Sequence, residues 1–343
     1  MKTDIERIRH IDWRKRSSAI VGLIVSGVFL YVAIQDLQPG QVWVAFKQAH
    51  YLWIVPAVGL YLFALVARTA RWQALLSSER HVPVRELLPT MAMGRGANNI
   101  YPFRTGEIIR VLLLRQRNDV SAAAGLASIL VERTFDGLTM ILFLILAALI
   151  GGIPGYLRYV VWSAAVVFGA ALALVYAMVL WPVPIQRLAE WFIAHLVPRR
   201  FRPRLRDISK RFINGFASIK STLTLTLVLL FSISVWAAET FSYRLLMNSF
   251  GFDVDLHQLL LMSSVANLGT ALPSGPGNVG TFDAPSILVL TRVGVARDTA
   301  ISYQTLLHAV LWCTETLAGL WFMWRVGLKK ADLDRTLAEQ SDR

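Results

Sequence analysis

Long apolar stretches alternate with short charged ones along nearly the whole chain. A transmembrane helix needs about 20 predominantly apolar residues, and six stretches reach this length. They are Ser17–Leu37, Tyr51–Ala70, Ser121–Ile150, Tyr156–Trp181, Ser221–Met247 and Thr299–Arg325. The pattern therefore predicts an all-α, polytopic helical membrane protein with about six full spans.

Two further apolar stretches are interrupted by Gly- and Pro-containing segments, Asn98–Glu107 and Leu272–Asp283. The apolar pieces beside these breaks are each too short to cross a bilayer. These pieces are Leu87–Ile100, Glu107–Arg115, Leu256–Leu272 and Thr281–Thr291. Backbone that leaves a helix at membrane depth must be buried in protein or line a cavity. We therefore predict two re-entrant helical hairpins, which bring the membrane-embedded elements to eight.

The charges predict how the chain is oriented. Basic residues mark cytoplasmic loops, and here they gather in residues 1–16, in Arg71–Arg85, in the Arg115–Asp119 turn, in 182–220 and at Lys329–Lys330. The loops predicted on the outer side of the membrane are 36–50, 151–155 and 248–255, and they contain Lys47 as their single basic residue. Both termini are then cytoplasmic, the first hairpin enters from inside and the second from outside. The alternative is eight plain spans with Pro kinks, which places the Arg115–Asp119 turn outside.

The expected domain organisation follows from this arrangement. A basic leader (1–16) precedes one membrane domain (17–325), and a polar tail (326–343) follows it. Within the domain, inverted halves of about 51–181 and 221–325 flank a basic loop, 182–220. This loop carries Trp191 and Phe192 near Arg187 and Arg199, so it is either an amphipathic stretch on the inner leaflet or a plain connection. Broken helices at matching places in two inverted halves indicate a transporter's binding site.

Composition removes several other classes of protein. Of the 343 residues, 55% are hydrophobic and 17% are charged, against about a quarter charged in soluble domains. The net charge of +13 is explained by membrane topology, so we expect no nucleic-acid partner. A single cysteine, Cys313, makes neither an intrachain disulfide nor a CxxC metal site. We expect no metal and no cofactor.

Ionisable residues inside spans are costly and usually functional. At the first break, Glu107 and Arg110 are three positions apart and can form an ion pair. Arg104 lies in the break itself, and a guanidinium matches a phosphate in a bidentate manner. Arg104 and Arg110 therefore either clamp the hairpin structurally or bind an anionic group.

The sequence Val-Glu-Arg-Thr-Phe-Asp contains three charges at membrane depth. Glu132 and Asp136 share a helical face, and Arg133 can pair with Asp136 three positions on. The remaining negative charge needs a partner from elsewhere, for which Arg104 or Arg110 is the natural choice. An interhelix salt-bridge network and direct substrate contact both fit.

The second half has its own ionisable residues at membrane depth: Glu239, Arg244, Asp283, His308 and Glu315. His308 and Glu315 share a face, so they form either a proton relay or simple hydrogen bonds. Asp283, just after the second break, is expected to cap the hairpin's second arm.

The glycines Gly275, Gly277 and Gly280 spell GxGxxG, but no strand or βαβ unit surrounds them, so a dinucleotide site is rejected. Glycine here lets backbone approach a ligand. The helices starting near Gly106 and Gly280 would direct their positive N-terminal ends at an anion. Tight turns without a ligand are the alternative.

Three segments together resemble a known family. The run Asn98–Glu107 with Arg110, the box Glu132–Asp136 and the run Pro273–Gly280 look like the flippase-like transmembrane domain of lysylphosphatidylglycerol synthases. Stand-alone relatives include YbhN-type and UPF0104-like membrane proteins. The resemblance covers about Ser17 to Arg325.

The resemblance implies movement of an anionic, aminoacylated or polyprenyl-linked lipid between leaflets of a bacterial-type inner membrane. Because no soluble synthase domain accompanies it here, we expect no enzyme activity and no catalytic residues. The expected partners are membrane lipids and an envelope-lipid enzyme. The alternatives are an intramembrane lipid-linked transferase, with Glu132 or Asp136 as base, and a non-transporting accessory protein. The candidate substrate-binding residues are Asn98, Asn99, Pro102, Arg104, Gly106, Glu107, Arg110, Glu132, Arg133, Asp136, Glu239, Pro273, Gly275, Gly277, Asn278, Gly280 and Asp283.

Overall fold

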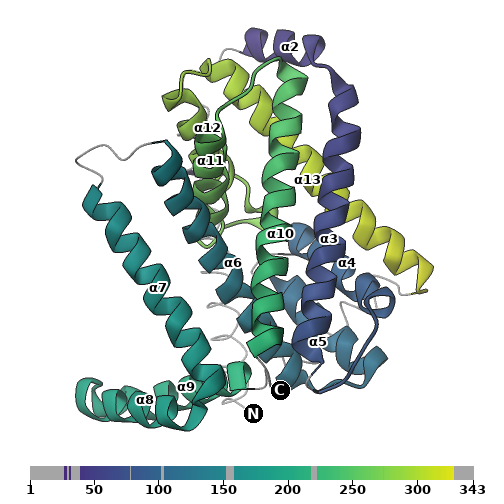
Figure 1. The fold of residues 1–343 in the computed structure, drawn as a ribbon. Helices are drawn as coiled ribbons and strands as arrows, with labels where there is room; N and C mark the ends of the chain where they lie inside the picture. Colours follow the sequence, from purple (N-terminus) through teal and green to yellow (C-terminus); the bar gives the residue numbers. More distant parts are fainter. Residues whose placement is uncertain are drawn as a thin grey trace, which may run out of the picture. The chain divides into compact units, whose positions relative to one another are not determined.

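The computed structural model describes residues 27–28, 31, 39–77, 79–101, 104–151, 158–217, 222–272 and 274–327. All regular structure in these residues is helical (Figure 1), so the all-α prediction is confirmed for them. The α-helices are α2 (Pro39–Gln48), α3 (Ile54–Leu76), α4 (Val84–Ile100), α5 (Thr105–Asn118), α6 (Ala122–Ile150), α7 (Arg158–Leu180), α8 (Pro182–Leu196), α9 (Arg202–Ala217), α10 (Thr222–Met247), α11 (Leu256–Gly269), α12 (Asp283–Arg292) and α13 (Arg297–Arg325). Single 3-10 turns lie at Tyr51–Trp53, Arg199–Phe201, Asn248–Phe250 and Pro276–Asn278.

Four helical segments of the described chain are long and apolar enough to cross a membrane: Tyr51–Leu76, Ala122–Ile150, Thr222–Phe250 and Arg297–Arg325. They correspond to four of the six predicted spans. The predicted span Tyr156–Trp181 corresponds to α7, and the part of α7 from Gly169 to Leu180 passes the test as a pair with α8, across a bend of 119°. The predicted span Ser17–Leu37 falls outside the described residues apart from isolated positions. The protein is thus a polytopic helical membrane protein.

Both interrupted stretches form two short helices. The pairs are α4 with α5 and α11 with α12, and their lengths of 17, 14, 14 and 10 residues correspond to about 15–26 Å, less than the roughly 30 Å hydrocarbon core. The arms of each pair pack together: Leu87 with Leu114 in one and Met262 with Ile287 in the other belong to common buried clusters. The breaks are confirmed, whereas re-entry and the inverted arrangement stay predictions.

Local sequence explains where several of these helices begin. Ser121 accepts a hydrogen bond from the Ala124 amide and so caps α6. Asp255 and Gln258 form a reciprocal capping box at the start of α11. α8 opens with Pro182, which needs no amide hydrogen bond at the first helical position.

The chain divides into two compact units. The first contains the described residues within 1–61, 92–107 and 240–327. Its core is built from α10, α11, the turn before α12, and α13, through the buried side chains of Tyr243, Met262, Phe282 and Tyr303. The Tyr303 hydroxyl donates to the Tyr243 carbonyl oxygen at 3.1 Å, which satisfies a buried polar group inside the apolar cluster.

The second unit contains the described residues within 62–91 and 108–239. One apolar cluster joins α6, α7, α9 and α10 through side chains such as Phe135, Met178, Ile213 and Val228. Another joins α3, α4 and α5 around Trp72, whose side chain is fully buried and donates to Ser128 on α6 at 2.9 Å. This unit holds most of the charged residues buried at membrane depth.

Candidate functional site

Arg104 joins the two breaks within the first unit. Its Nη2 donates to the carbonyl oxygen of Thr270, the C-cap residue of α11, at 2.9 Å. Its Nη1 lies 4.0 Å from Glu107 Oε1, and the side chain remains 40% exposed. The backbone at Arg104 has a φ of 51°, a conformation that non-glycine residues adopt rarely. A guanidinium therefore lies where the first and second broken segments meet, with part of its surface open.

The other residues of the first break fix its geometry. The Gly106 amide donates to Asn98 Oδ1 at 2.8 Å, and a Cβ at Gly106 would overlap the Gly94 carbonyl oxygen. Asn99 donates to the Trp312 carbonyl and the Thr316 hydroxyl of α13, each at 3.2 Å. These predicted site residues bind protein groups and hold the break in place. Pro102, and Pro273 of the second break, lie outside the described residues.

The second break is shaped by three residues with positive φ: Gly277 (71°), Asn278 (59°) and Gly280 (83°). Ser274 donates to Asn278 Oδ1 at 3.0 Å across the turn. A Cβ at Gly277 would lie 3.1 Å from the Trp312 ring, so glycine is needed there for close approach as well as for backbone conformation. Gly275 precedes the 3-10 turn in extended conformation.

Asp283 accepts three hydrogen bonds at the end of this break. The donors are the Gly280 amide (2.8 Å), Gln304 Nε2 (2.9 Å) and His308 Nδ1 (2.6 Å). The prediction that Asp283 caps the second arm is wrong in detail, because Asp283 is the first residue of α12 and its carboxylate binds the preceding turn and α13. It therefore attaches the broken segment to α13.

His308 completes this attachment. Its Nε2 lies 3.0 Å from the Gly277 carbonyl oxygen while its Nδ1 contacts Asp283, so the imidazole bridges both ends of the Gly277–Asp283 segment. The expected relation between His308 and Glu315 is not the main contact of either residue. Glu315 instead accepts from Arg95 Nε at 2.6 Å and from the Tyr61 hydroxyl at 2.5 Å.

Arg95 and Tyr61 did not emerge as site residues from the sequence. They contact Glu315 where α4 and α13 come very close: a Cβ at Gly96 would lie 3.0 Å from the Glu315 carbonyl oxygen. The signal for this contact was the run Gly94-Arg95-Gly96, small residues that permit close helix approach beside a charge.

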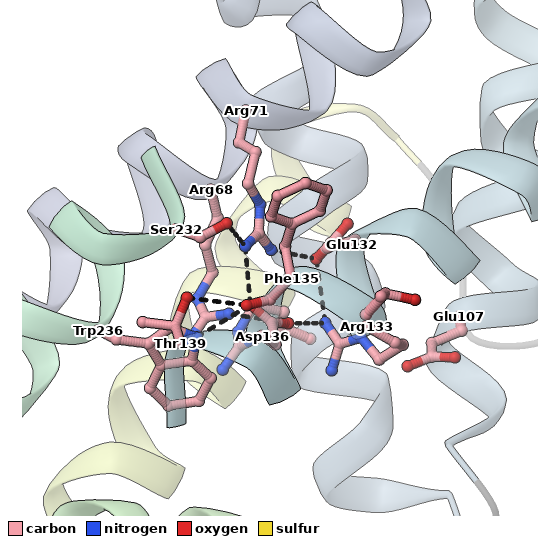
Figure 2. Close-up of polar contacts among 12 residues, drawn as sticks. Arg68, Arg71, Glu107, Glu132, Arg133, Phe135, Asp136, Thr139, Ser232 and Trp236 are labelled. Atoms are coloured by element: carbon pink, nitrogen blue, oxygen red, sulfur yellow. Dashed lines mark hydrogen bonds and ion pairs between the residues drawn. The ribbon is translucent and has the colours of Figure 1, made fainter. Parts of the chain in front are cut away.

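The second unit contains a buried network of arginines and carboxylates (Figure 2). Glu132 contacts Arg110 at 2.8 Å, Arg133 at 3.0 Å and Arg71 at 3.2 Å. The prediction that Arg110 pairs with the Glu132–Asp136 box is thus confirmed. The Arg110 guanidinium also lies over the Trp72 ring, 4.3 Å from the centroid. Arg110 therefore pairs with Glu132 of another helix and not with Glu107, the partner that its spacing had suggested.

Asp136 is the second centre of the network. It contacts Arg71 at 2.7 Å, Arg133 at 3.0 Å and the Trp236 ring nitrogen at 2.9 Å. The Arg133 contact was predicted from the three-residue spacing and is confirmed. Glu239 of α10 binds Arg68 at 2.6 Å, and Arg68 reaches Asp136 at 3.9 Å. Three helices, α3, α6 and α10, are therefore linked by charge.

Arg68 and Arg71 are two further residues that sequence reasoning missed. Their positions after an apolar run predicted the end of a span and the start of a cytoplasmic loop. Instead α3 continues to Leu76, and the two residues are 1% and 0% exposed. The signal was their three-residue spacing, which places both on one helical face together with Leu75 and Trp72 on adjacent turns. In the described residues, no group of three or more His, Cys, Asp or Glu could hold a metal ion.

The apolar spans, the broken helices and the charges buried at membrane depth define an integral, polytopic helical membrane protein. The model of the lysylphosphatidylglycerol synthase TM region matches residues 19–319. The chain belongs to this family, which confirms the resemblance carried by the broken segments and the Glu132–Asp136 box.

Several known proteins are similar over most of the chain. A UPF0104 membrane protein of Methanothermobacter thermautotrophicus is 24% identical over 331 residues, covering 92% of this chain and 94% of its own. The glycosyltransferase AglD of Haloferax volcanii is 22% identical over 362 residues, covering 96% of this chain but 58% of its own. A UPF0104 membrane protein of Methanocaldococcus jannaschii is 20% identical over 225 residues, covering 65% and 90%. No solved structure matches significantly.

Proposed function

We propose that this protein is a lipid translocase that moves an anionic or modified lipid between membrane leaflets. The observation that carries the proposal is the meeting of the two broken segments at Arg104 and Thr270 in the first unit. A half-exposed guanidinium beside two helix breaks offers donors to a phosphate or carboxylate headgroup. The acyl chains would remain in the surrounding lipid while the headgroup passes.

The remaining candidate residues have structural roles in this proposal. Glu132, Asp136 and Glu239 are each held by arginines inside the second unit, which favours a structural role that keeps α3, α6 and α10 together. Gly277 and Gly280 give the second break its shape. We place the protein in a bacterial-type inner membrane with both termini in the cytoplasm, and an envelope-lipid enzyme is the partner class that fits.

A lipid-linked transferase is the second candidate, favoured by the name of the relative AglD. The present chain covers 58% of AglD. The name of AglD therefore does not assign a glycosyltransferase activity to the region that the two proteins share. A carboxylate base must be free to accept a proton in the transition state. Glu132 and Asp136 each form ion pairs with three arginines, and this surrounding positive charge disfavours protonation of either carboxylate. Turnover of a lipid-linked sugar donor by the purified protein would support this second candidate instead.

The test is translocation of a fluorescent anionic phospholipid in proteoliposomes, followed by quenching from the outer leaflet. Loss of a charge-assisted hydrogen bond is worth about 1.5–3 kcal/mol, so we expect Arg104→Gln to slow translocation about ten- to hundred-fold. Arg104→Lys keeps the charge and should retain part of the rate. Arg292→Gln, at an exposed position, is the matched control and should leave the rate unchanged.

Two outcomes contradict the proposal. If Arg104→Gln translocates as fast as the unmodified protein, the headgroup does not bind at this break. If the unmodified protein moves no anionic lipid at all and copurifies stoichiometrically with an envelope-lipid enzyme, the accessory role replaces the translocase.

A further inference from the structure

α8 leaves the direction of α7 abruptly. α7 ends at Leu180, α8 begins at Pro182, and the two helices are bent by 119° at the single residue between them (Figure 1). With 15 residues, α8 is about 22 Å long, too short to cross a hydrocarbon core of about 30 Å. If α7 tilts by about 30° from the bilayer normal, within the usual range, α8 lies in the membrane plane.

One face of α8 packs onto the second unit. Ile185 and Ala189 lie against the buried cluster that includes Val175 and Ile213, and α8 also packs along α9. Lys210 of α9 lies 3.5 Å from Glu190 of α8, which adds a surface ion pair between the two helices. The orientation of α8 about its own axis is thereby fixed.

The neighbouring face of α8 carries large apolar side chains that the protein leaves uncovered. Leu188, Trp191, Phe192 and Leu196 are spaced at helical intervals and are 50%, 55%, 47% and 72% exposed. Trp191 and Phe192 pack edge-to-face, with ring centroids 5.1 Å apart. Apolar surface of this kind on one helix face marks an interaction site.

Exposed basic residues accompany this apolar row on α8 and in the segment that follows it. Residues 182–217 contain eight Lys or Arg residues and two acidic ones, Glu190 and Asp207. Among the exposed basic residues are Arg187, Arg199, Arg200, Arg204, Arg206 and Lys210. An exposed apolar row that contains Trp, in a segment rich in Arg and Lys, is typical of helices that lie in the interface of an anionic bilayer.

We propose that the α8–α9 surface, formed by the apolar row and these basic residues, docks onto anionic phospholipid of the leaflet that faces the basic loop. Its occupant is the bilayer and not a protein partner, because α8 continues directly from a membrane helix and carries a charge complementary to anionic headgroups. Each Lys or Arg near such a surface adds about 1 kcal/mol of attraction. The inference does not depend on lipid translocation.

The experiment measures how deeply α8 sits in the membrane. Single cysteines replace Leu188, Phe192 and Gln186 in the Cys313→Ser background, and each full-length variant carries a spin label in vesicles of neutral phosphatidylcholine, with or without phosphatidylglycerol. Gln186 is the matched control, since a separation of two helical residues turns it about 160° away from Leu188. Power saturation with oxygen and with a water-soluble nickel complex reports lipid and water exposure.

We expect labels at positions 188 and 192 to be accessible to oxygen and shielded from nickel in the anionic vesicles, and the label at 186 to be more exposed to nickel. Changing Arg199, Arg200, Arg204 and Arg206 together to Gln should abolish the difference between anionic and neutral vesicles. The inference is overturned if positions 188 and 192 are exposed to nickel in both vesicles, if they are immobilised away from both reagents, or if depth is the same with and without anionic lipid.

Discussion

Arg68 and Arg71 are enclosed almost completely, yet each guanidinium has an acidic partner within 3.2 Å. Transferring charges out of water is costly, and the pairs in the second unit offset that cost only as long as every member is present. Asp136 illustrates this, because its oxygens receive contacts from Arg71, Arg133 and Trp236 at the same time. Removing Arg71 takes one counter-charge from both Glu132 and Asp136 at once.

Replacing Arg71 with Met should therefore destabilise the protein by about 3–5 kcal/mol, the usual cost of breaking a buried ion pair from one side. Thermal unfolding of the detergent-solubilised protein measures this. Arg117→Met, at an exposed position near the end of α5, is the control and should change stability by less than about 1 kcal/mol. Equal unfolding temperatures for the two variants would contradict the structural role of the network.

Outside the spans, Asp253 provides a pH-dependent contact. Arg244 Nη2 donates to Asp253 Oδ2 at 2.5 Å, and this hydrogen bond lowers the pKa of Asp253. Since the folded-state pKa lies below the unfolded value of about 3.9, the contact stabilises the protein above that pH and is lost as the pH falls through the folded-state value.

The stability gain is small, because the two side chains are 37% and 48% exposed. We expect less than about 1 kcal/mol. Melting curves of the protein in lipid nanodiscs between pH 2 and 6 should show the unmodified protein slightly more stable than Asp253→Asn above pH 4, with the difference vanishing at the acidic end. A difference that grows on acidification has the wrong sign for this contact.

At the scale of helices, glycines decide how closely segments approach. Gly319 of α13 faces Ala92 and Gly96 of α4: a Cβ there would lie 2.9 Å from the Ala92 carbonyl oxygen and 3.2 Å from the Gly96 Cα. Close backbone contact between small residues is a common way to pack helices in membranes. The Arg95–Glu315 contact depends on this proximity.

Gly319→Ala should therefore push α4 and α13 apart and lower stability by about 1–3 kcal/mol, the typical cost of overpacking. The measurement is thermal unfolding in detergent. Gly59→Ala is the matched control, because a Cβ at Gly59 meets nothing within 4 Å. That control should be neutral or slightly stabilising, since Ala favours helix more than Gly.

The His308 contacts make a prediction for the second break. His308→Leu removes the bonds to Asp283 and to the Gly277 carbonyl, so the segment around Ser274 should open more often. A cysteine at Ser274 in the Cys313→Ser background should then react with a thiol reagent about tenfold faster, given about 1.5–3 kcal/mol for a charge-assisted bond. Thr305→Leu, at an exposed position of the same helix, should leave the rate unchanged. Unaltered reactivity in His308→Leu would mean that other contacts hold the break.

Local spacing allowed some of these features to be predicted from sequence and left others hidden. Arg133 and Asp136 lie one helical turn apart, so their pairing follows from helix geometry alone. Arg71 and Asp136 are 65 positions apart, and Arg68 and Glu239 are 171 apart, so only the packing of α3 against α6 and α10 brings them together. The helix breaks were visible because Pro and Gly act locally, whereas their meeting through Arg104 and Thr270 is a tertiary contact.

For the whole molecule, the orientation of the two short-helix pairs is the main prediction. In the inverted arrangement, the turn after α5 is cytoplasmic and the turn after α12 is external. Eight plain spans would place the turn after α5 outside. The described residues contain four clear spans, so the topology rests on how these pairs enter the membrane.

Membrane-impermeant thiol labelling of intact cells distinguishes the two arrangements. Single cysteines at the exposed positions Gln116 and Ala296, again without Cys313, should react differently: Ala296→Cys should be labelled and Gln116→Cys protected until the cells are opened. Labelling of Gln116→Cys in intact cells would establish the plain-span arrangement. Both variants should label fully after permeabilisation, which controls for accessibility.

The charge network on α3 also bears on how the protein is made. Arg68 and Arg71, in the C-terminal half of α3, are synthesised well before Asp136 and Glu239, and an unpaired charge costs up to about 2.5–3.5 kcal/mol at the centre of an inserting helix. The nascent α3 is therefore expected to stay in contact with the insertion machinery until α6, and later α10, have been synthesised. Stable insertion of α3 would then depend on the later synthesis of α6 and α10. A nascent chain truncated before α6 should leave α3 poorly integrated in the membrane.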